Sequence, residues 1–193
     1  LVLIKLEETG HILGSFTKSK TPGEPVKWNK SIIKQKKVSA ILINSGNANV
    51  FTGPAGKKAI LDILNKLSSN LGVPKNEIFL ASTGVIGEPL ESEKIIRKIP
   101  LLIKSLKNER LAWVKAADAI RTTDTYSKYD SEIVSRNDSL FINGIAKGSG
   151  MIQPNMATML GFIFTNYDVS SKQIEIGFKE IIDKTFNSIS VDG

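Results

Sequence analysis

Cysteine is absent from the 193-residue chain, and histidine occurs once, as His11. Without cysteine the chain has no disulfide framework and no thiolate nucleophile. A zinc site would have to be built mainly from carboxylates, which is rare, and a serine triad would have to use His11, which has no obvious partner in the sequence. We therefore expect no metal and no such triad, and we interpret His11 as a structural residue at a strand edge. A chain without cysteine also fits a cytoplasmic protein.

Long apolar runs are also missing, and the first residues lack the basic leader and small-residue cleavage site of a signal peptide. Arginine is scarce although the net charge is +7. Base readout and phosphate binding favour arginine, and no basic run of this chain is interleaved with aromatic residues. We therefore expect neither membrane nor nucleic acid among the partners, and we interpret the charge as a solvated, lysine-rich surface.

The composition is that of a soluble globular protein, with 41% apolar and 23% charged residues. The length allows one ordinary domain with a sizeable core, or two small domains. Leu1 opens directly into a strand-like run without an initiator Met, and Ser190–Gly193 end the chain without a polar tail. We expect a single domain over residues 1–193 that is incomplete.

Hydrophobic periodicity and turn residues predict a mixture of strands and helices. Strands are expected over Leu1–Leu6, His11–Thr17, Val38–Asn44, Ile78–Ala81 and Met159–Thr165, and a hairpin turning at Asn137-Asp138 is expected to join Glu132–Arg136 to Ser139–Ile145. Helices are expected over Ile60–Leu71 before Gly72, over Ile95–Leu106 with a break or kink at Pro100, over Leu111–Ile120, and after a capping box at Ser170–Gln173. Lys18–Lys27 contains proline and glycine and is expected to be a loop. Because strands and helices do not alternate strictly, we favour an α+β fold over a doubly wound parallel sheet.

Three polar loops of small residues follow buried strands, at Ser45–Asn49, Ser82–Gly87 and Lys147–Thr158. Functional sites usually lie on loops that a rigid scaffold positions. A nucleotide site is not indicated, because the chain has neither a Walker sequence nor the three glycines of a dinucleotide fingerprint. In the first loop, Asn47 and Asn49 are expected to form side-chain-to-backbone hydrogen bonds that organise the loop.

A hydroxyl can act as nucleophile without histidine when it belongs to the N-terminal residue of a chain, because the α-amine of that residue then serves as the base. Such an amine has a pKa of about 8, so a useful fraction is unprotonated near neutral pH. Ala157-Thr158 precedes the expected strand Met159–Thr165 and suits a cleavage that would free Thr158. Threonine also favours strands, so on these residues alone an ordinary strand opening is the better interpretation.

Four segments, in this order along the chain, resemble the ornithine acetyltransferase (glutamate N-acetyltransferase) family. They are Ile43–Asn49 (INSGNAN), Ala81–Pro89 (ASTGVIGEP), Arg121–Thr125 (RTTDT) and Lys147–Leu160 (KGSGMIQPNMATML). The resemblance implies a layered α/β/β/α sandwich of the α+β class. It also implies self-cleavage between Ala157 and Thr158, which divides this chain into segments 1–157 and 158–193.

The same resemblance implies the reaction. An acetyl group passes from N2-acetylornithine to glutamate through an acetyl ester of Thr158, in arginine biosynthesis, and ornithine is released. No cofactor takes part, although some members of the family are multifunctional and also accept the acetyl group from acetyl-CoA. The two cleavage fragments are expected to stay associated and to assemble into a larger oligomer.

The resemblance also implies roles for residues outside the cleavage position. Thr83, through its hydroxyl, and Gly84, through its backbone N–H, would stabilise the oxyanion. Lys147 would bind the substrate, at a carboxylate, and either Thr122 or Thr123 would donate a hydrogen bond to it. The spacing does not decide between the two threonines.

Two other functions remain open. One is an amidohydrolase or aminopeptidase with the same fold and an N-terminal nucleophile, which would release its acyl group to water instead of to an amine. The other is a non-catalytic α+β binding module, for which Thr158 would have no chemical role.

Overall fold

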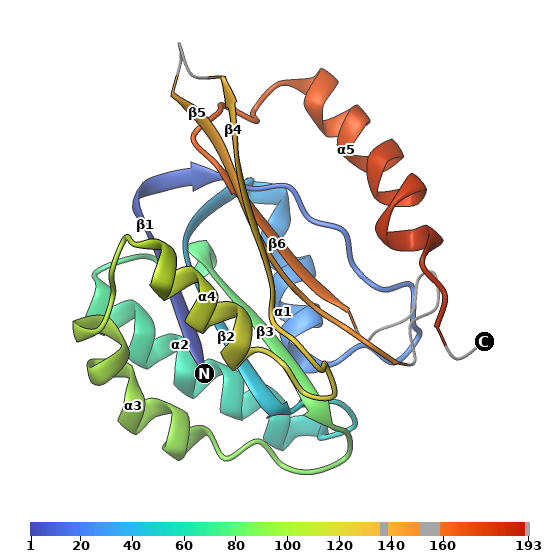
Figure 1. The fold of residues 1–193 in the computed structure, drawn as a ribbon. Coiled ribbons are helices and arrows are strands. Elements are labelled where there is room, and N and C mark those ends of the chain that lie inside the picture. The colour runs from blue at the N-terminus through green and yellow to red at the C-terminus, as the bar shows by residue number, and fades with distance from the viewer. Residues whose placement is uncertain (136–138, 151–158, 192–193) are drawn as a thin grey trace. The chain divides into compact units, whose positions relative to one another are not determined.

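The computed structural model describes residues 1–135, 139–150 and 159–191. The chain divides into two compact units, Leu1–Asn108 and Glu109–Gly193, and each contains one three-stranded sheet (Figure 1). Two compact units can belong to one domain or to two, so the expected single domain stays a prediction. The expected cleavage position, Ala157-Thr158, lies outside the described residues.

The sheet of the first unit has the order β1-β2-β3. Strand β1 (Val2–His11) runs antiparallel to β2 (Lys37–Asn47), and β2 runs parallel to β3 (Ile78–Val85). Residues 38–43 of β2 are all buried, so the prediction of a strand covered on both faces is confirmed. An apolar run without alternation forms such a central strand because both of its faces leave water.

Helix α2 (Gly53–Leu71) is the crossover between the parallel strands β2 and β3. It ends at Gly72, whose φ of +68° is the left-handed cap expected from the sequence. Helix α3 (Ser92–Lys104) packs beside α2 and continues through Pro100, so of the predicted break or kink the break does not occur. Pro100 is exposed, while Ile95 and Ile99 on the buried side enter the core and hold the helix in place. The core of this unit is formed by apolar residues of the sheet, α2 and α3: Leu3, Ala40, Leu42, Ile60, Ile63, Leu64, Leu67, Ile78, Leu80, Ile95 and Ile99.

Two predictions near the N-terminus are wrong. Residues 24–27 do not belong to a loop but open helix α1 (Glu24–Ile32), because Pro25 occupies the first turn, where a missing N–H costs nothing. His11–Thr17 is not a strand, because the strand expected over Leu1–Leu6 extends as β1 to His11, with an irregular register between Lys5 and Gly10. A bulge of this kind lets one strand absorb residues that read as a turn in the sequence.

The sheet of the second unit has the order β4-β5-β6, with β4 (Lys128–Ser135), β5 (Leu140–Lys147) and β6 (Leu160–Thr165) antiparallel to their neighbours. The predicted hairpin and the third strand are confirmed, whereas the Asn137-Asp138 turn lies outside the described residues. Helix α4 (Arg110–Ala119) packs on this sheet through Trp113, whose ring centroid lies 5.0 Å from that of Phe164.

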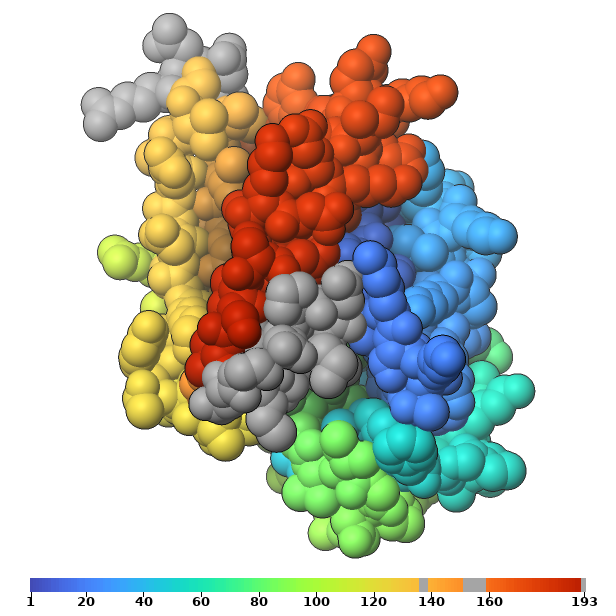
Figure 2. Space-filling model, turned by 90° about the vertical axis from the view of Figure 1, so that its right-hand side faces the viewer, coloured from blue at the N-terminus to red at the C-terminus, as the bar shows by residue number. Residues whose placement is uncertain are grey.

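Helix α5 (Lys172–Lys184) follows β6. Its N-cap is Ser171, whose hydroxyl accepts from the Ile174 N–H at 3.3 Å, so the capping side chain lies one residue later than the predicted Ser170. None of the residues Lys172–Lys184 is buried, and the helix is in view along its length in Figure 2. Short 3-10 helices occupy Ile33–Gln35, Lys75–Glu77 and Phe186–Ser188.

The expected α+β class is confirmed: five α-helices and two sheets lie within the part of the chain that the structure describes. In that same part, no helix is long and apolar enough to cross a membrane.

Candidate functional site

The first group of predicted site residues lies where β2 and β3 end. Because the strands are parallel, their carboxyl ends meet at the same edge of the sheet: Ser45 is opposite Thr83, and Gly46 is opposite Gly84. Thr83 is buried, with 6% of its surface exposed, and Gly84 is exposed. The structure thus brings two of the three predicted loops side by side.

Gly84 makes an unusually close approach to the neighbouring strand. A Cβ on Gly84 would lie 2.3 Å from the Gly46 carbonyl carbon and 2.6 Å from the Asn47 nitrogen. Its φ of +130° is also unfavourable for residues with a side chain. Only glycine therefore satisfies both the conformation and the space at this position.

Side-chain amides tie these two loops together. The Asn44 carboxamide accepts from the Ser82 hydroxyl at 2.5 Å and donates to the Asn47 carbonyl at 2.8 Å. The Asn47 carboxamide donates to the Glu88 carbonyl at 3.0 Å and accepts from the Asn49 N–H at 2.8 Å. The prediction that Asn47 and Asn49 organise the loop is confirmed, and Asn49 adds a bond to the Gly56 carbonyl at 3.2 Å.

The second group lies in the second unit, where the loop Arg121–Thr125 meets the end of β5. Lys147 is the last residue of β5, and its side chain is only 1% exposed. Its Nζ donates to the Thr122 hydroxyl at 2.8 Å. The neighbouring Thr123 hydroxyl shares a hydrogen bond with the Ser149 hydroxyl at 3.0 Å. Lys147 and Thr122, both predicted as substrate-binding residues, are therefore direct partners.

Asp124 stands between these contacts, and its side chain is fully buried. Its Oδ1 accepts from the Gly148 N–H at 2.7 Å and from the Lys128 ammonium at 2.6 Å, while its Oδ2 lies 4.0 Å from the Lys147 Nζ. Burial opposes ionisation of Asp124, but these hydrogen bonds and the charge of Lys128 outweigh it, so the pKa of the carboxyl lies below its ordinary value.

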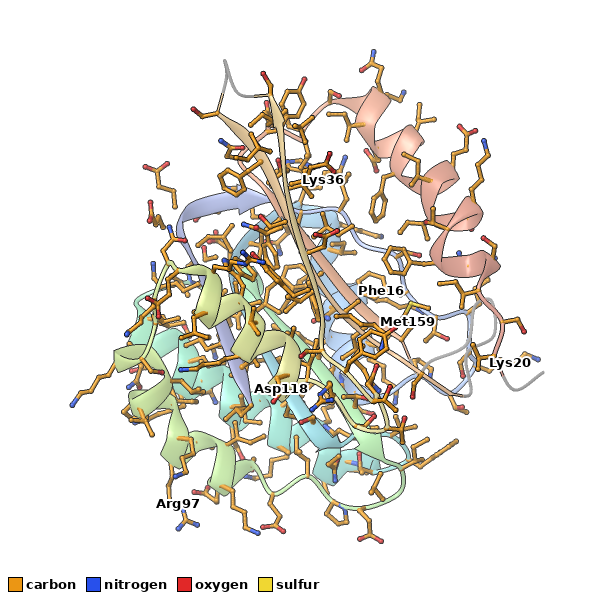
Figure 3. All side chains as sticks on the ribbon, viewed as in Figure 1. Phe16, Lys20, Lys36, Arg97, Asp118 and Met159 are labelled. Carbon is orange, nitrogen blue, oxygen red and sulfur yellow. The ribbon has the colours of Figure 1, made fainter. Side chains whose placement is uncertain are left out.

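The loop is also braced from its other end. Arg121 donates to the Asp124 carbonyl at 3.2 Å and forms an ion pair with Asp118 at 2.7 Å. Asp118 lies near the end of α4 (Figure 3). Residues 122, 123 and 124 thus hold residues 147, 149 and 148 respectively, and we call this set of contacts the threonine-loop clamp.

The burial of Lys147 has an electrostatic consequence. Burial lowers the pKa of its ammonium, the Asp124 carboxylate opposes this, and the Lys128 ammonium adds to it, so the pKa lies below its ordinary value of 10.5. A buried ionisable group with a perturbed pKa is a candidate for a functional site.

Ala157 and Thr158 lie outside the described residues. Thr83 and Gly84 belong to Leu1–Asn108, and Thr122, Thr123 and Lys147 belong to Glu109–Gly193. Within residues 1–135, 139–150 and 159–191, no group of three or more His, Cys, Asp or Glu side chains could hold a metal.

Sequence reasoning missed Asp124, Asn44 and Lys128. Asp124 lies inside a segment that the sequence singled out, but an aspartate between threonines reads as a solvated loop residue. Its one usable signal was chemical: a carboxylate near a candidate cation can be its counter-ion.

Arg97 illustrates the ordinary solvated charge. It is exposed, and its side chain points from α3 into solvent (Figure 3).

Comparisons with known proteins place these residues in a family. The family model described as ArgJ family matches residues 1–193. The chain is 41% identical to the arginine biosynthesis bifunctional protein ArgJ of Bartonella henselae over 193 residues, which are all of this chain and 47% of that protein. It is 39% identical to the protein of the same name from Bradyrhizobium diazoefficiens, again over all of this chain and 46% of the relative. The chain therefore spans about half the length of the curated relatives that it matches.

Two solved structures share the fold. The crystal structure of arginine biosynthesis bifunctional protein ArgJ from Bacillus halodurans matches with a TM-score of 0.64 and 28% identity, over 80% of this chain and 81% of that chain. The crystal structure of ornithine acetyltransferase complexed with ornithine from Mycobacterium tuberculosis matches with a TM-score of 0.73 and 26% identity, over 82% of each chain. The sequence segments, the fold and the family match over residues 1–193 agree: the chain belongs to the ArgJ family.

Proposed function

We propose that the full-length protein is a self-cleaving acetyltransferase of arginine biosynthesis that moves an acetyl group from N2-acetylornithine to glutamate. The names of the Bartonella henselae and Mycobacterium tuberculosis relatives support the pathway, the transfer and ornithine as a ligand. The observation that carries the proposal is the threonine-loop clamp. It buries an ammonium, that of Lys147, beside the segment that leads to Thr158.

Lys147 is suited to a substrate carboxylate by its charge balance. Among the ion pairs of the described residues, the ammonium groups of Lys128 and Lys147 both lie near the Asp124 carboxylate. The surplus of positive charge would be neutralised by the carboxylate that N2-acetylornithine and glutamate each carry beside the reacting nitrogen. Thr122, the hydroxyl partner of Lys147, fixes the direction of the ammonium.

Thr158 is the proposed nucleophile of both reactions. In cleavage its hydroxyl attacks the Ala157 carbonyl, the C–N bond breaks to give an ester, and water hydrolyses the ester and leaves Thr158 with a free α-amine. The lengths of the solved chains support such a cut. Each match covers nearly the same share of the solved chain as of this chain, so the solved chains are about as long as this one. They are therefore about half as long as the curated relatives.

Acetyl transfer then proceeds in two halves. The Thr158 hydroxyl gives its proton to the α-amine and attacks the acetyl carbonyl of N2-acetylornithine, and the resulting oxyanion accepts from the Thr83 hydroxyl and the Gly84 N–H. Collapse of the intermediate breaks the C–N bond, returns the proton to the leaving nitrogen and releases ornithine. The amine of glutamate attacks the acetyl ester in the same way, which gives N-acetylglutamate and restores the Thr158 hydroxyl.

The proposal needs no metal and no cofactor, because the nucleophile, base and oxyanion donors all belong to the protein. Acetyl-CoA would enter only as a second acetyl donor to the same hydroxyl. The two cleavage fragments would stay associated, since each carries part of the machinery, and would assemble further into an oligomer. The lack of cysteine supports a cytoplasmic setting.

Product analysis tests the proposal. The full-length protein is incubated with N2-acetylornithine, with and without glutamate, and ornithine, N-acetylglutamate and acetate are quantified. We expect ornithine and N-acetylglutamate in equal amounts, formed only when glutamate is present. Acetate release that does not respond to glutamate would instead identify a hydrolase, and no turnover would favour a binding module.

A further inference from the structure

We propose that Asp124 is a positioning residue with two separable tasks: its Oδ1 fixes the Gly148 N–H at the start of the cleavage segment, and its charge holds the Lys147 ammonium for substrate. The inference rests on the proposed function, because it assigns Asp124 to the cleavage and binding steps described above. Thr122 also holds the Lys147 ammonium, but through a hydrogen bond, and none of the predicted site residues carries a negative charge.

The first task follows from the contacts of Oδ1. This atom accepts from the Gly148 N–H at 2.7 Å, across 24 residues of sequence, and from the Lys128 ammonium at 2.6 Å. A buried carboxylate needs partners that compensate for lost hydration, and these two donors supply that compensation. Gly148 is the first residue after β5, and its φ of +147° directs the chain out of the sheet. The bond therefore sets the point from which the segment toward Ala157 departs.

The second task follows from the other oxygen. Among the residues that the structure describes, Oδ2 is buried without a hydrogen-bond partner of ordinary geometry, and it lies 4.0 Å from the Lys147 Nζ. At that separation it acts on Lys147 through charge and not through a hydrogen bond. Asp124 is thus the carboxylate that pairs with Lys128 through Oδ1 and faces the Lys147 ammonium through Oδ2.

The two oxygens allow the tasks to be separated by substitution. Asp124→Asn keeps a carbonyl oxygen that can accept from the Gly148 N–H, but it removes the negative charge. Asp124→Ala removes both. Asp130 provides a matched control, because it is an exposed aspartate of the same unit whose Oδ1 also accepts one backbone N–H, that of Ser131 at 2.8 Å.

The experiment uses full-length protein carrying Asp124→Asn, Asp124→Ala, Asp130→Asn or Asp130→Ala. It measures the rate of self-cleavage, KM and kcat with N2-acetylornithine, and hydrogen exchange of the Gly148 amide. For Asp124→Asn we expect cleavage and Gly148 exchange close to wild type, a KM raised roughly tenfold or more, and kcat changed far less. For Asp124→Ala we expect cleavage slowed and Gly148 exchange accelerated, each by roughly tenfold or more. The Asp130 variants should match wild type.

Equal effects of Asp124→Asn and Asp124→Ala on cleavage and exchange would overturn the first task, and an unchanged KM in Asp124→Asn would overturn the second. A residue with only a structural role would not raise KM while leaving kcat and cleavage intact. If Asp124→Ala does not fold, Asp124→Ser, whose hydroxyl is too short to reach Gly148, replaces it.

Gly148 exchange separates this inference from the proposed function. Suppose that the wild type is uncut and inactive, but Gly148 exchange is faster in Asp124→Ala and unchanged in Asp124→Asn. That result would contradict the proposed function and support the first task. Suppose instead that the wild type is cleaved and active, but Gly148 exchange is the same in the wild type and in both Asp124 variants. That result would support the proposed function and contradict the first task.

Discussion

The Nζ of Lys147 donates to the hydroxyl of Thr122 at 2.8 Å, whereas the hydroxyl of the adjacent Thr123 bonds Ser149 at 3.0 Å. The two threonines, which the sequence could not distinguish, therefore serve different partners. Thr122 orients the ammonium that we assign to substrate, and Thr123 holds the segment that leads to the cleavage position.

Substitution of each threonine by valine separates these roles. Thr122→Val removes the partner of a charged donor, so we expect KM for N2-acetylornithine to rise by roughly tenfold. Thr123→Val leaves Lys147 untouched and serves as the matched control, with KM near wild type. Steady-state kinetics of the full-length protein decide the matter; a larger KM effect from Thr123→Val would reverse the assignment.

The lowered pKa of Lys147 predicts weaker ligand binding on the alkaline side. Lys147 attracts a carboxylate only while protonated, so binding is complete below its pKa in the folded protein and declines as the pH rises through that pKa, which lies below 10.5. The inhibition constant of N-acetylnorvaline, which has the carboxylate of the substrate but no side-chain amine, should rise over this range. Lys147→Arg, whose guanidinium stays charged, should abolish the rise. A constant affinity in wild type up to pH 10.5 would contradict the assignment.

The close contact at Gly84 predicts a difference between two glycines with positive φ. Gly84→Ala would place a Cβ 2.3 Å from the Gly46 carbonyl carbon, whereas a Cβ on Gly87, whose φ is +88°, meets nothing within 4 Å. Both substitutions incur backbone strain, so Gly87→Ala is the control for strain without collision. We expect Gly84→Ala to lower the free energy of unfolding by at least about 1 kcal/mol more than Gly87→Ala does, as measured by denaturant unfolding. Equal losses of unfolding free energy in the two variants would show that β2 and β3 move apart to accommodate the added Cβ at no cost in stability.

The proposed oxyanion role of Thr83 predicts parallel losses in two reactions. Removal of one oxyanion donor typically slows a reaction by roughly 100-fold to 1000-fold. Thr83→Ala should therefore slow self-cleavage and acetyl transfer alike, while Thr83→Ser, which keeps the hydroxyl, should retain most of both. Ser82→Ala removes the neighbouring hydroxyl, which is bonded to Asn44, and is the control for loosening of the loop. A Thr83→Ala variant that transfers acetyl groups at the wild-type rate would remove Thr83 from the mechanism.

Elements with a strong local pattern could be predicted from the sequence. The repeating leucines and isoleucines of α2, with Gly72 behind them, and the unbroken apolar run of β2 each specify one structure on local grounds. Helix α1 could not be found in this way, because Pro25 resembles a loop residue until its place in a first turn is known. The covering of β3 by α1 is a tertiary effect: Trp28 and Asn29 donate to the carbonyls of Ile78 and Leu80.

The candidate site likewise contains residues that could be predicted from the sequence and residues whose roles depend on folding. Lys147, Thr122 and Thr83 could be named because they lie in segments that resemble a family. Asp124 could not be given a role, since its partner Gly148 is 24 residues away and the bond exists only after β5 and the loop have met. The charge relationships around Lys147 are likewise a product of folding, because burial creates the need for a counter-ion.

The most direct test of the account is the mass of the full-length protein on a denaturing gel, beside its Thr158→Ala variant. We predict two fragments for the wild type, with the second fragment beginning at Thr158 by N-terminal sequencing, and one uncut chain for Thr158→Ala. Thr185→Ala, a threonine of the same unit whose hydroxyl donates to the Ile181 carbonyl at the end of α5, should still yield two fragments. A wild-type protein that transfers acetyl groups as a single uncut chain would contradict the assignment of Thr158 as an N-terminal nucleophile.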